Sequence, residues 1–183
     1  LTDHGVMFGA VNFFKECKKN DIKPIIGCEV YVAPRSRFSK ESNLDSEYSH
    51  LILLVKNKTG YQNLIKLVSL SFTEGFYYKP RIDLEILEKY SEGLICLSAC
   101  LAGSINQAIL RDDIEKAKEI ALWHKRVFKD DYYLEVQNNG LRKQVLVNQK
   151  LVELSKELDI PLVATNDAHY LKKEDSYNHE VLL

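Results

Sequence analysis

The sequence lacks any apolar run long enough to cross a bilayer. Runs such as residues 51–55 fall far short of the roughly 20 residues that a membrane-spanning helix needs, and no charged-then-apolar leader opens the chain. The four cysteines show neither Cys-x-x-Cys spacing nor the density of a disulfide scaffold, so reduced thiols are expected. These absences argue against a membrane protein and a secreted disulfide-rich domain, and they favour a cytoplasmic protein.

Neither sign of charge dominates, since 25 basic residues face 26 acidic ones. The field of the whole chain would therefore not hold it on nucleic acid without local patches or another domain. A length of 183 residues suits one domain. Leu1 and Thr2 read as the end of a strand, and a helix expected near Lys173 lacks a stop signal. We therefore expect residues 1–183 to form a single partial domain, truncated at both ends.

Strand-like and helix-like segments alternate along the chain. Apolar residues at helical spacing predict a helix over residues 9–19, and a β-branched segment from Pro24 predicts a strand after it. Thr59 and Asp83 are expected to cap further helices. The other expected elements are strands at residues 49–55, 94–98, 131–137 and 161–165, helices at 114–128 and 145–158, and a polar rim loop at 35–47.

Residues of metal-ligand type stand at the strand boundaries. They are His4, Glu29, His50, Cys100, Asp167 and His169. The expected strands are apolar on both faces, which is typical of a parallel-stranded α/β fold. A barrel gathers the carboxyl ends of its strands at one mouth, whereas an open sheet spreads them out. The pattern therefore favours a barrel with a metal site at its mouth.

These residues also have structural explanations. Glu29 is the hardest to explain in this way, because a carboxylate inside an apolar strand is costly unless it is paired or bound to a cation. Cys100 alone is more often a small buried apolar residue, and His50 can cap a strand or stay neutral and hydrogen-bonded. His124 lies among charged residues on a helix and is expected at the solvated surface. His179 stays open, because a helix that follows a site can point a side chain back toward it.

The position of His50 raises a question of strand direction. It opens an apolar run, whereas a ligand at a barrel mouth should follow one. Either the strand after His50 is antiparallel to its neighbours, or residues before His50 already form the strand. The sequence leaves both alternatives open.

A weak nucleic-acid signal lies in the stretch FYYKPR, where aromatic residues adjoin Lys79 and Arg81. Such cations can contact a backbone phosphate. The alternative is a packed loop with solvated charges. The same alternative applies to Arg35, Arg37 and Lys40, because a charged run is usually a solvated face.

Several stretches together resemble a known family. They are LTDHG, KPIIGCEVYV, SHLILLVKNKTGYQNL, EGFYYKPRID, EGLICLSACLAG, YYLEVQNNG, PLVATNDAHY and KKEDSYNHEVLL. In order and spacing they resemble the PHP (polymerase and histidinol phosphatase) domain of bacterial DNA polymerase III alpha subunits, over essentially the entire chain. TGYQNL, EGFYYKPRID and the run from NDAHY to HEVLL point to this branch of the superfamily.

The resemblance implies an α/β fold, a distorted (β/α)7-type PHP barrel that here lacks its first strand and loop. It also implies a metal cluster held by His4, Glu29, His50, Cys100, Asp167 and His169, with Glu29 bridging two metals. Asp3 corresponds to no ligand of the family, but it adjoins His4 and is expected to orient its imidazole. Two or three divalent ions of zinc, manganese or iron are expected in the intact domain. The family's upstream His-x-His pair and Asp are absent from residues 1–183, so this chain alone is expected to be metal-poor.

The function implied is a metal-dependent phosphoesterase of the 3′–5′ exonuclease type within a DNA-directed DNA polymerase that serves DNA replication. The alternative is a catalytically silent platform that docks a separate proofreading exonuclease. The magnesium-dependent polymerase site would lie in other domains. DNA, the proofreading exonuclease and the sliding clamp are the partners implied for the full-length protein, and little or no activity is expected from this chain alone.

Overall fold

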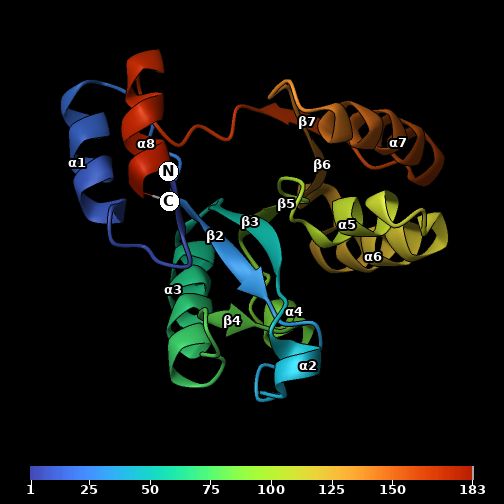
Figure 1. The fold of residues 1–183 in the computed structure, drawn as a ribbon. Coiled ribbons are helices and arrows are strands. Elements are labelled where there is room, and N and C mark those ends of the chain that lie inside the picture. The colour runs from blue at the N-terminus through green and yellow to red at the C-terminus, as the bar shows by residue number, and fades with distance from the viewer. Residues whose placement is uncertain (183) are drawn as a thin grey trace.

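A computed structural model describes residues 1–182 as a mixed sheet flanked by helices (Figure 1). Leu183, the last residue of the expected C-terminal segment, lies outside the described residues. The strands are β1 (Thr2–His4), β2 (Gly27–Val32), β3 (Ser49–Val55), β4 (Arg81–Ile82), β5 (Leu94–Leu97), β6 (Tyr132–Gln137) and β7 (Leu162–Thr165). The helices are α1 (Ala10–Lys19), α2 (Ser42–Asp45), α3 (Lys58–Thr73), α4 (Leu84–Lys89), α5 (Ser104–Leu110), α6 (Ile114–Phe128), η1 (Lys129–Asp131), α7 (Arg142–Leu158), η2 (Lys173–Asp175) and α8 (Ser176–Leu182).

The strands follow the spatial order β1-β2-β3-β5-β6-β7, and β4 pairs with β2. Strand β1 is parallel to β2, and β5, β6 and β7 are parallel to one another in sequence. Strand β3 is antiparallel to both β2 and β5. The segment between β2 and β3 contains only the short helix α2 and no long crossover helix, so the chain can turn back beside β2. Strand β3 is therefore the exception in a sheet whose other pairings are parallel, and of the two alternatives left open for His50 the antiparallel one holds.

This antiparallel pairing answers the question raised by His50. In the register of β2 and β3, His50 stands opposite Tyr31, near the carboxyl end of β2. The start of β3 thus lies at the same edge as the ends of its neighbours. Within the described residues, β1 and β7 do not pair, so the barrel-like sheet is not closed by hydrogen bonds.

The two faces of the sheet pack into two separate apolar clusters. Residues such as Cys28, Leu53 and Cys96 point outward into the main core beneath the helices. Their strand neighbours Ile52 and Leu97 point inward and form a smaller apolar cluster with Ala99, Leu54, Ile95, Tyr133 and Val163. Alternation along a strand explains why the strands are apolar on both faces. The inner cluster forms an apolar floor below the edge where His50 lies.

The helix starts show which capping expectations hold. The Asp83 carboxylate accepts a hydrogen bond from the Ile86 amide and caps α4, as expected. Helix α3 is capped by Asn57, whose side chain accepts from Gly60, so the expected cap at Thr59 is wrong. A Cβ on Gly60 would lie 1.8 Å from the carbonyl oxygen of Gly93, so only glycine lets α3 pack this closely against the turn before β5.

The polar excursion at residues 35–47 is fastened by ion pairs, and only part of its charge lies on a solvated face, since Arg35 and Lys40 are exposed whereas Arg37 is buried. The Arg37 guanidinium lies 2.6 Å from Glu74 and 3.1 Å from Asp83, and this arginine is only 7% exposed. The Arg35 guanidinium is paired with the fully buried Asp45 at 2.7 Å. The short distance between opposite charges offsets the cost of burying them.

Arg81 is also part of this fastening, although its sequence context indicated a contact with phosphate. It is fully buried and donates hydrogen bonds to the backbone carbonyls of Gly75 at 3.1 Å, Asp45 at 2.7 Å and Ser39 at 2.9 Å. A guanidinium used in this way cannot reach a nucleic acid, so that expectation is wrong for Arg81. Lys79 is exposed.

His124 is buried, contrary to the expectation of a surface position. It is 4% exposed, with Nδ1 2.8 Å from the Ile120 carbonyl oxygen and its ring stacked on Tyr132 at 5.2 Å between centroids. Burial lowers the pKa of His124 to about 4, so the imidazole is neutral at pH 7. The charged residues beside it in sequence lie on other faces of α6.

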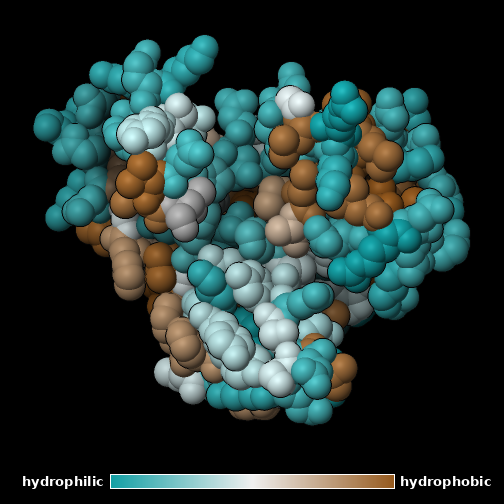
Figure 2. All heavy atoms as spheres, in the orientation of Figure 1, coloured by the Kyte–Doolittle hydropathy of each residue, from teal (hydrophilic) through white to brown (hydrophobic). Residues whose placement is uncertain are grey.

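Part of the surface is apolar. Figure 2 shows brown side chains gathered over α7, where Leu141, Val145, Leu146 and Val152 are exposed. None of the described helices is both long and apolar enough to cross a membrane.

Candidate metal centre

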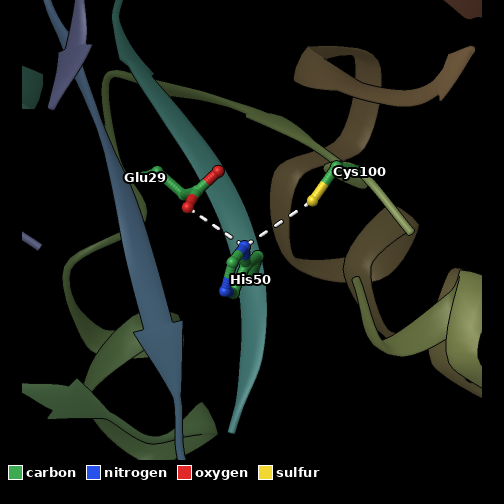
Figure 3. Close-up of side chains that lie close together, drawn as sticks. All are labelled: Glu29, His50 and Cys100. Atoms are coloured by element: carbon green, nitrogen blue, oxygen red, sulfur yellow. Dashed lines mark hydrogen bonds and ion pairs between the residues drawn. The ribbon is translucent and has the colours of Figure 1, made fainter. Parts of the chain in front are cut away.

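Three side chains of metal-ligand type converge at the edge of the sheet (Figure 3). Glu29 comes from β2, His50 from the start of β3 and Cys100 from the turn after β5. Glu29 Oε1 lies 3.0 Å from His50 Nδ1, and Cys100 Sγ lies 3.6 Å from the same nitrogen. One ligand atom from each residue falls within 4.8 Å of the other two.

These three atoms cannot all satisfy their hydrogen-bonding capacity through one another. A single imidazole nitrogen carries either one proton or one lone pair, so it cannot satisfy both a carboxylate and a thiol. Glu29 is 4% exposed, and in the described part of the chain the one nitrogen close to its Oε1 is His50 Nδ1 at 3.0 Å, which it shares with Cys100 Sγ. A cation among the three atoms would satisfy the oxygen, the nitrogen and the sulfur at once. The residues present therefore fit a divalent metal.

The site is electrostatically coupled. Burial by itself would raise the pKa of Glu29, but the adjacent His50, with His4 and His169, outweighs burial and holds this pKa below its ordinary value. Burial would lower the pKa of His50, but hydrogen bonding to Cys100 and Glu29 raises it to about 9. A metal that binds His50 Nδ1 must displace this proton, so binding would release a proton below about pH 9.

His4 and His169 extend the cluster on the side of β1. His4 Nε2 lies 3.8 Å from Glu29 Oε1, and the rings of His4 and His169 are 5.2 Å apart. His179, whose role the sequence left open, lies 5.6 Å from the His169 ring. Asp167 is less closely engaged, with its Oδ1 3.9 Å from His169 Nδ1. The structure thus gathers His4, Glu29, His50, Cys100 and His169 and leaves Asp167 at the margin.

Asp3 does not contact His4 in the way the sequence indicated. Its carboxylate accepts a hydrogen bond from the Gly9 amide at 2.9 Å and so holds the loop that leads into α1. A Cβ on Gly9 would lie 2.9 Å from the same carboxylate oxygen. Asp3 therefore shapes the loop after β1.

The turn that carries Cys100 is tightly held. Ala99 adopts a left-handed conformation with φ of 65°, which is uncommon for a residue other than glycine. The buried Asn106 side chain donates to the carbonyls of Ala99 at 3.1 Å and Cys100 at 2.7 Å. Gly103 is required because a Cβ there would lie 2.2 Å from the carbonyl oxygen of Ser98.

Asp167, in the loop after β7, also has a positive φ, of 50°. Backbone strain of this kind is often concentrated at functional sites.

Sequence reasoning missed two inward-facing residues on β6. Glu135 and Gln137 alternate with Leu134 and Val136, so they share the inner face with Tyr133 of the apolar floor. Glu135 is 3% exposed and Gln137 4% exposed. The signal was present as the period-two spacing in YYLEVQ, which places a carboxylate on an otherwise buried face.

A cleft reaches one member of the centre, His50, while Glu29 and Cys100 are not among its lining residues. Its volume is about 570 Å³, and its lining includes Tyr48, Ser49, His50, Gln107, Arg111 and Lys116. The Tyr48 ring is stacked on His50 with centroids 6.0 Å apart. A molecule in this cleft would thus contact His50 between the Tyr48 ring and the basic side chains of Arg111 and Lys116.

Comparisons with known proteins agree with this geometry. Residues 1–139 match the PHP domain. The chain belongs to the PHP domain family. The matched segment of this PHP domain includes His4, Glu29, His50 and Cys100 and ends before Asp167 and His169.

Several curated relatives match over the entire chain. It is 53% identical to the DNA polymerase III subunit alpha of Borreliella burgdorferi, 50% identical to that of Treponema pallidum and 49% identical to that of Thermus aquaticus. The chain spans 15–16% of the length of these relatives. The similarity of this PHP domain to them thus includes the segment from Asp167 to His179, which lies beyond the family match.

Proposed function

We propose that this chain is the PHP-domain part of a DNA polymerase III alpha subunit and that its centre hydrolyses phosphoesters with two or three divalent metal ions. The observation that carries the proposal is the convergence of Glu29 Oε1, His50 Nδ1 and Cys100 Sγ on one point. A thiolate among the ligands favours zinc, and imidazole with carboxylate also suits manganese or iron.

Each candidate ligand would have its own place in the metal cluster. Glu29 lies between His50 and His4, so its carboxylate would hold an ion together with either histidine. His50 and Cys100 would hold one side of the cluster, and His4 with His169 the other, with Asp167 as a further ligand beside His169. Bound divalent ions would acidify a water molecule and neutralise charge on the phosphate. Hydrolysis adds that water's oxygen to phosphorus, breaks one ester P–O bond and leaves the proton on the departing oxygen.

The cleft beside His50 is the proposed substrate site. Arg111 lines it and has no carboxylate partner among residues 1–182, so its guanidinium is available for a phosphate. The Tyr48 ring can stack on a base. A DNA strand that enters through this cleft would present its terminal phosphoester to the metal centre.

The relatives support a proposal for the role of the whole protein. We place this chain in a DNA-directed DNA polymerase of replication whose magnesium-dependent nucleotidyl transfer site lies in other domains, working in the cytoplasm with a proofreading exonuclease and a sliding clamp. The identity of 53% across the entire chain supports this assignment. The unpaired edges of β1 and β7 are the places where a further strand would complete the barrel.

A structural platform is the second candidate function. His50 with its raised pKa can hold a proton between Glu29 and Cys100, so the cluster is also paired without metal. Such a cluster would hold β2, β3 and the turn after β5 together while another subunit supplied the exonuclease. This reading predicts a stable protein without transition metal.

Elemental analysis after purification without added metal tests the first proposal. The chain with its native flanking sequence should contain two or three zinc, manganese or iron ions, and residues 1–183 alone should contain fewer. Hydrolysis of bis-p-nitrophenyl phosphate should require these ions and should be lost in Glu29→Gln. No transition metal in either form would refute the centre and leave the platform; bound metal without turnover in the flanked form would refute the phosphoesterase activity.

A further inference from the structure

Strand β6 contributes none of the expected metal ligands, yet its inner face carries a buried carboxylate. Glu135 is 3% exposed, and no Lys or Arg is among its hydrogen-bond partners in the described chain. Burial raises the pKa of Glu135, although hydrogen bonds from Thr165 and Gln137 oppose this rise. A carboxylate without a cationic partner is costly in such a place. A role in packing alone would be served better by an apolar side chain.

The hydrogen bonds of Glu135 connect three segments of the sheet. One carboxylate oxygen, Oε1, accepts a short hydrogen bond from the Thr165 hydroxyl on β7 and a bond of 3.0 Å from the Gln137 amide. The backbone amide of Glu135 donates to the Ser98 hydroxyl at 2.8 Å. Glu135 is thus joined to the end of β5 on one side and to the end of β7 on the other.

Both outer partners stand two residues before an expected ligand. Ser98 precedes Cys100, and Thr165 precedes Asp167. Each of these short stretches contains a residue with positive φ, 65° at Ala99 and 50° at Asp167. A backbone in such a conformation persists only where its surroundings hold it. The bonds made by Glu135 lie where the two ligand-bearing turns leave their strands.

We propose that Glu135 is a positioning residue of the metal centre: its carboxylate fixes the turn carrying Asp167 to β6, the strand whose backbone amide at residue 135 also holds the turn carrying Cys100. This inference rests on the metal centre proposed above. The Glu135 side chain acts through Thr165 and Gln137 and needs no contact with the metal, and the backbone bond to Ser98 is kept when the side chain is replaced. Partners of this kind fix the orientation of metal ligands, and their loss typically weakens metal binding about 10- to 100-fold.

The test is cobalt binding by the metal-free protein with its native flanking sequence. Cobalt bound to a thiolate gives a charge-transfer absorption that reports the Cys100–metal bond directly. Glu135→Ala should weaken cobalt affinity about tenfold or more and reduce this absorption. Glu135→Gln should restore most of both, because an amide oxygen can accept the same two bonds. Thr165→Val, which removes one of the two bonds, should fall between them.

Gln144→Ala is the matched control. Gln144 on α7 is another buried polar residue with an unpaired side-chain oxygen, and its amide donates to Asn148 at 2.8 Å, outside the inner face of the sheet. This variant should lose stability but keep the wild-type affinity and absorption. Measurements at a temperature where circular dichroism shows each variant folded separate the two effects.

The outcomes are distinct. Wild-type affinity and absorption in Glu135→Ala, or an equal loss in Gln144→Ala, would overturn the positioning role. If Glu135→Ala does not fold, Thr165→Val decides, and an unchanged cobalt spectrum there overturns the role. Wild-type protein that binds no cobalt would instead overturn the metal centre, and the positioning role with it.

Discussion

The network around Arg37 and Arg81 and the centre around Glu29 both bury charge, but their hydrogen-bonding groups are satisfied differently. Each donor of Arg81 that the structure describes meets a carbonyl, and Arg37 lies between Glu74 and Asp83. At Glu29 the oxygen, the nitrogen and the sulfur lie within 4.8 Å of one another, and Glu29 Oε1 and Cys100 Sγ share a single nitrogen, His50 Nδ1. Closed pairing indicates a structural network, whereas convergence of unsatisfied ligand atoms indicates a site for a cation.

The largest expected effect lies in the closed network. Arg81→Met should destabilise the fold by about 3–5 kcal/mol, because it leaves buried carbonyls of Gly75, Asp45 and Ser39 without donors. Urea denaturation measures this loss. Cobalt affinity of the folded fraction should be unchanged, and a parallel loss of affinity would break the distinction between the two clusters.

A single buried imidazole provides a third type of buried polar group. The pKa of His124 in the folded chain is about 4, against an ordinary value near 6.5. Between these pH values the His124 imidazole is protonated in the unfolded chain and neutral in the folded chain. The free energy of unfolding should therefore fall by up to about 3 kcal/mol as the pH drops from 6.5 to 4. Comparison with His124→Phe isolates this contribution. Equal pH slopes for the two proteins would contradict the burial of a neutral His124.

At the metal centre the expected effect is on binding, not on folding. Glu29→Gln keeps the size of the side chain and removes the charge that draws a cation, so zinc affinity should fall by about 100-fold or more. The urea midpoint of the metal-free protein should stay near that of wild type. Arg37→Met is the control and should show the reverse, with lower stability and normal zinc affinity. The same changes in both variants would contradict the distinction between the structural network and the metal centre.

The smallest effect is expected at Asp3, on the border between site and scaffold. Asp3→Ala removes one hydrogen bond to the Gly9 amide and should cost about 1 kcal/mol of stability. Zinc affinity should hold, because the carboxylate bonds to the loop. Isothermal titration decides this, since a tenfold weaker affinity would show that Asp3 orients His4 after all.

The sequence predicted the parts of this structure that depend on local pattern. The helix over residues 114–128 and the strand over 49–55 are confirmed, because helical spacing and a continuous apolar run are visible within a few turns of chain. Glu29 also stood out locally as a carboxylate between apolar neighbours. Arg81 and His124 were misjudged, because their sequence neighbours are charged while their spatial neighbours are carbonyls and aromatic rings.

The sequence by itself determined the element types, the apolar character of both strand faces and the residue types available to hold a metal. Only the tertiary structure decided that β3 runs antiparallel, that His50 therefore meets Glu29 and Cys100 at one edge, and that Glu135 joins the turns after β5 and β7. The physical reason is range. Propensity and periodicity act over a few residues, whereas strand direction and the burial of a charge depend on segments that meet only when the sheet assembles.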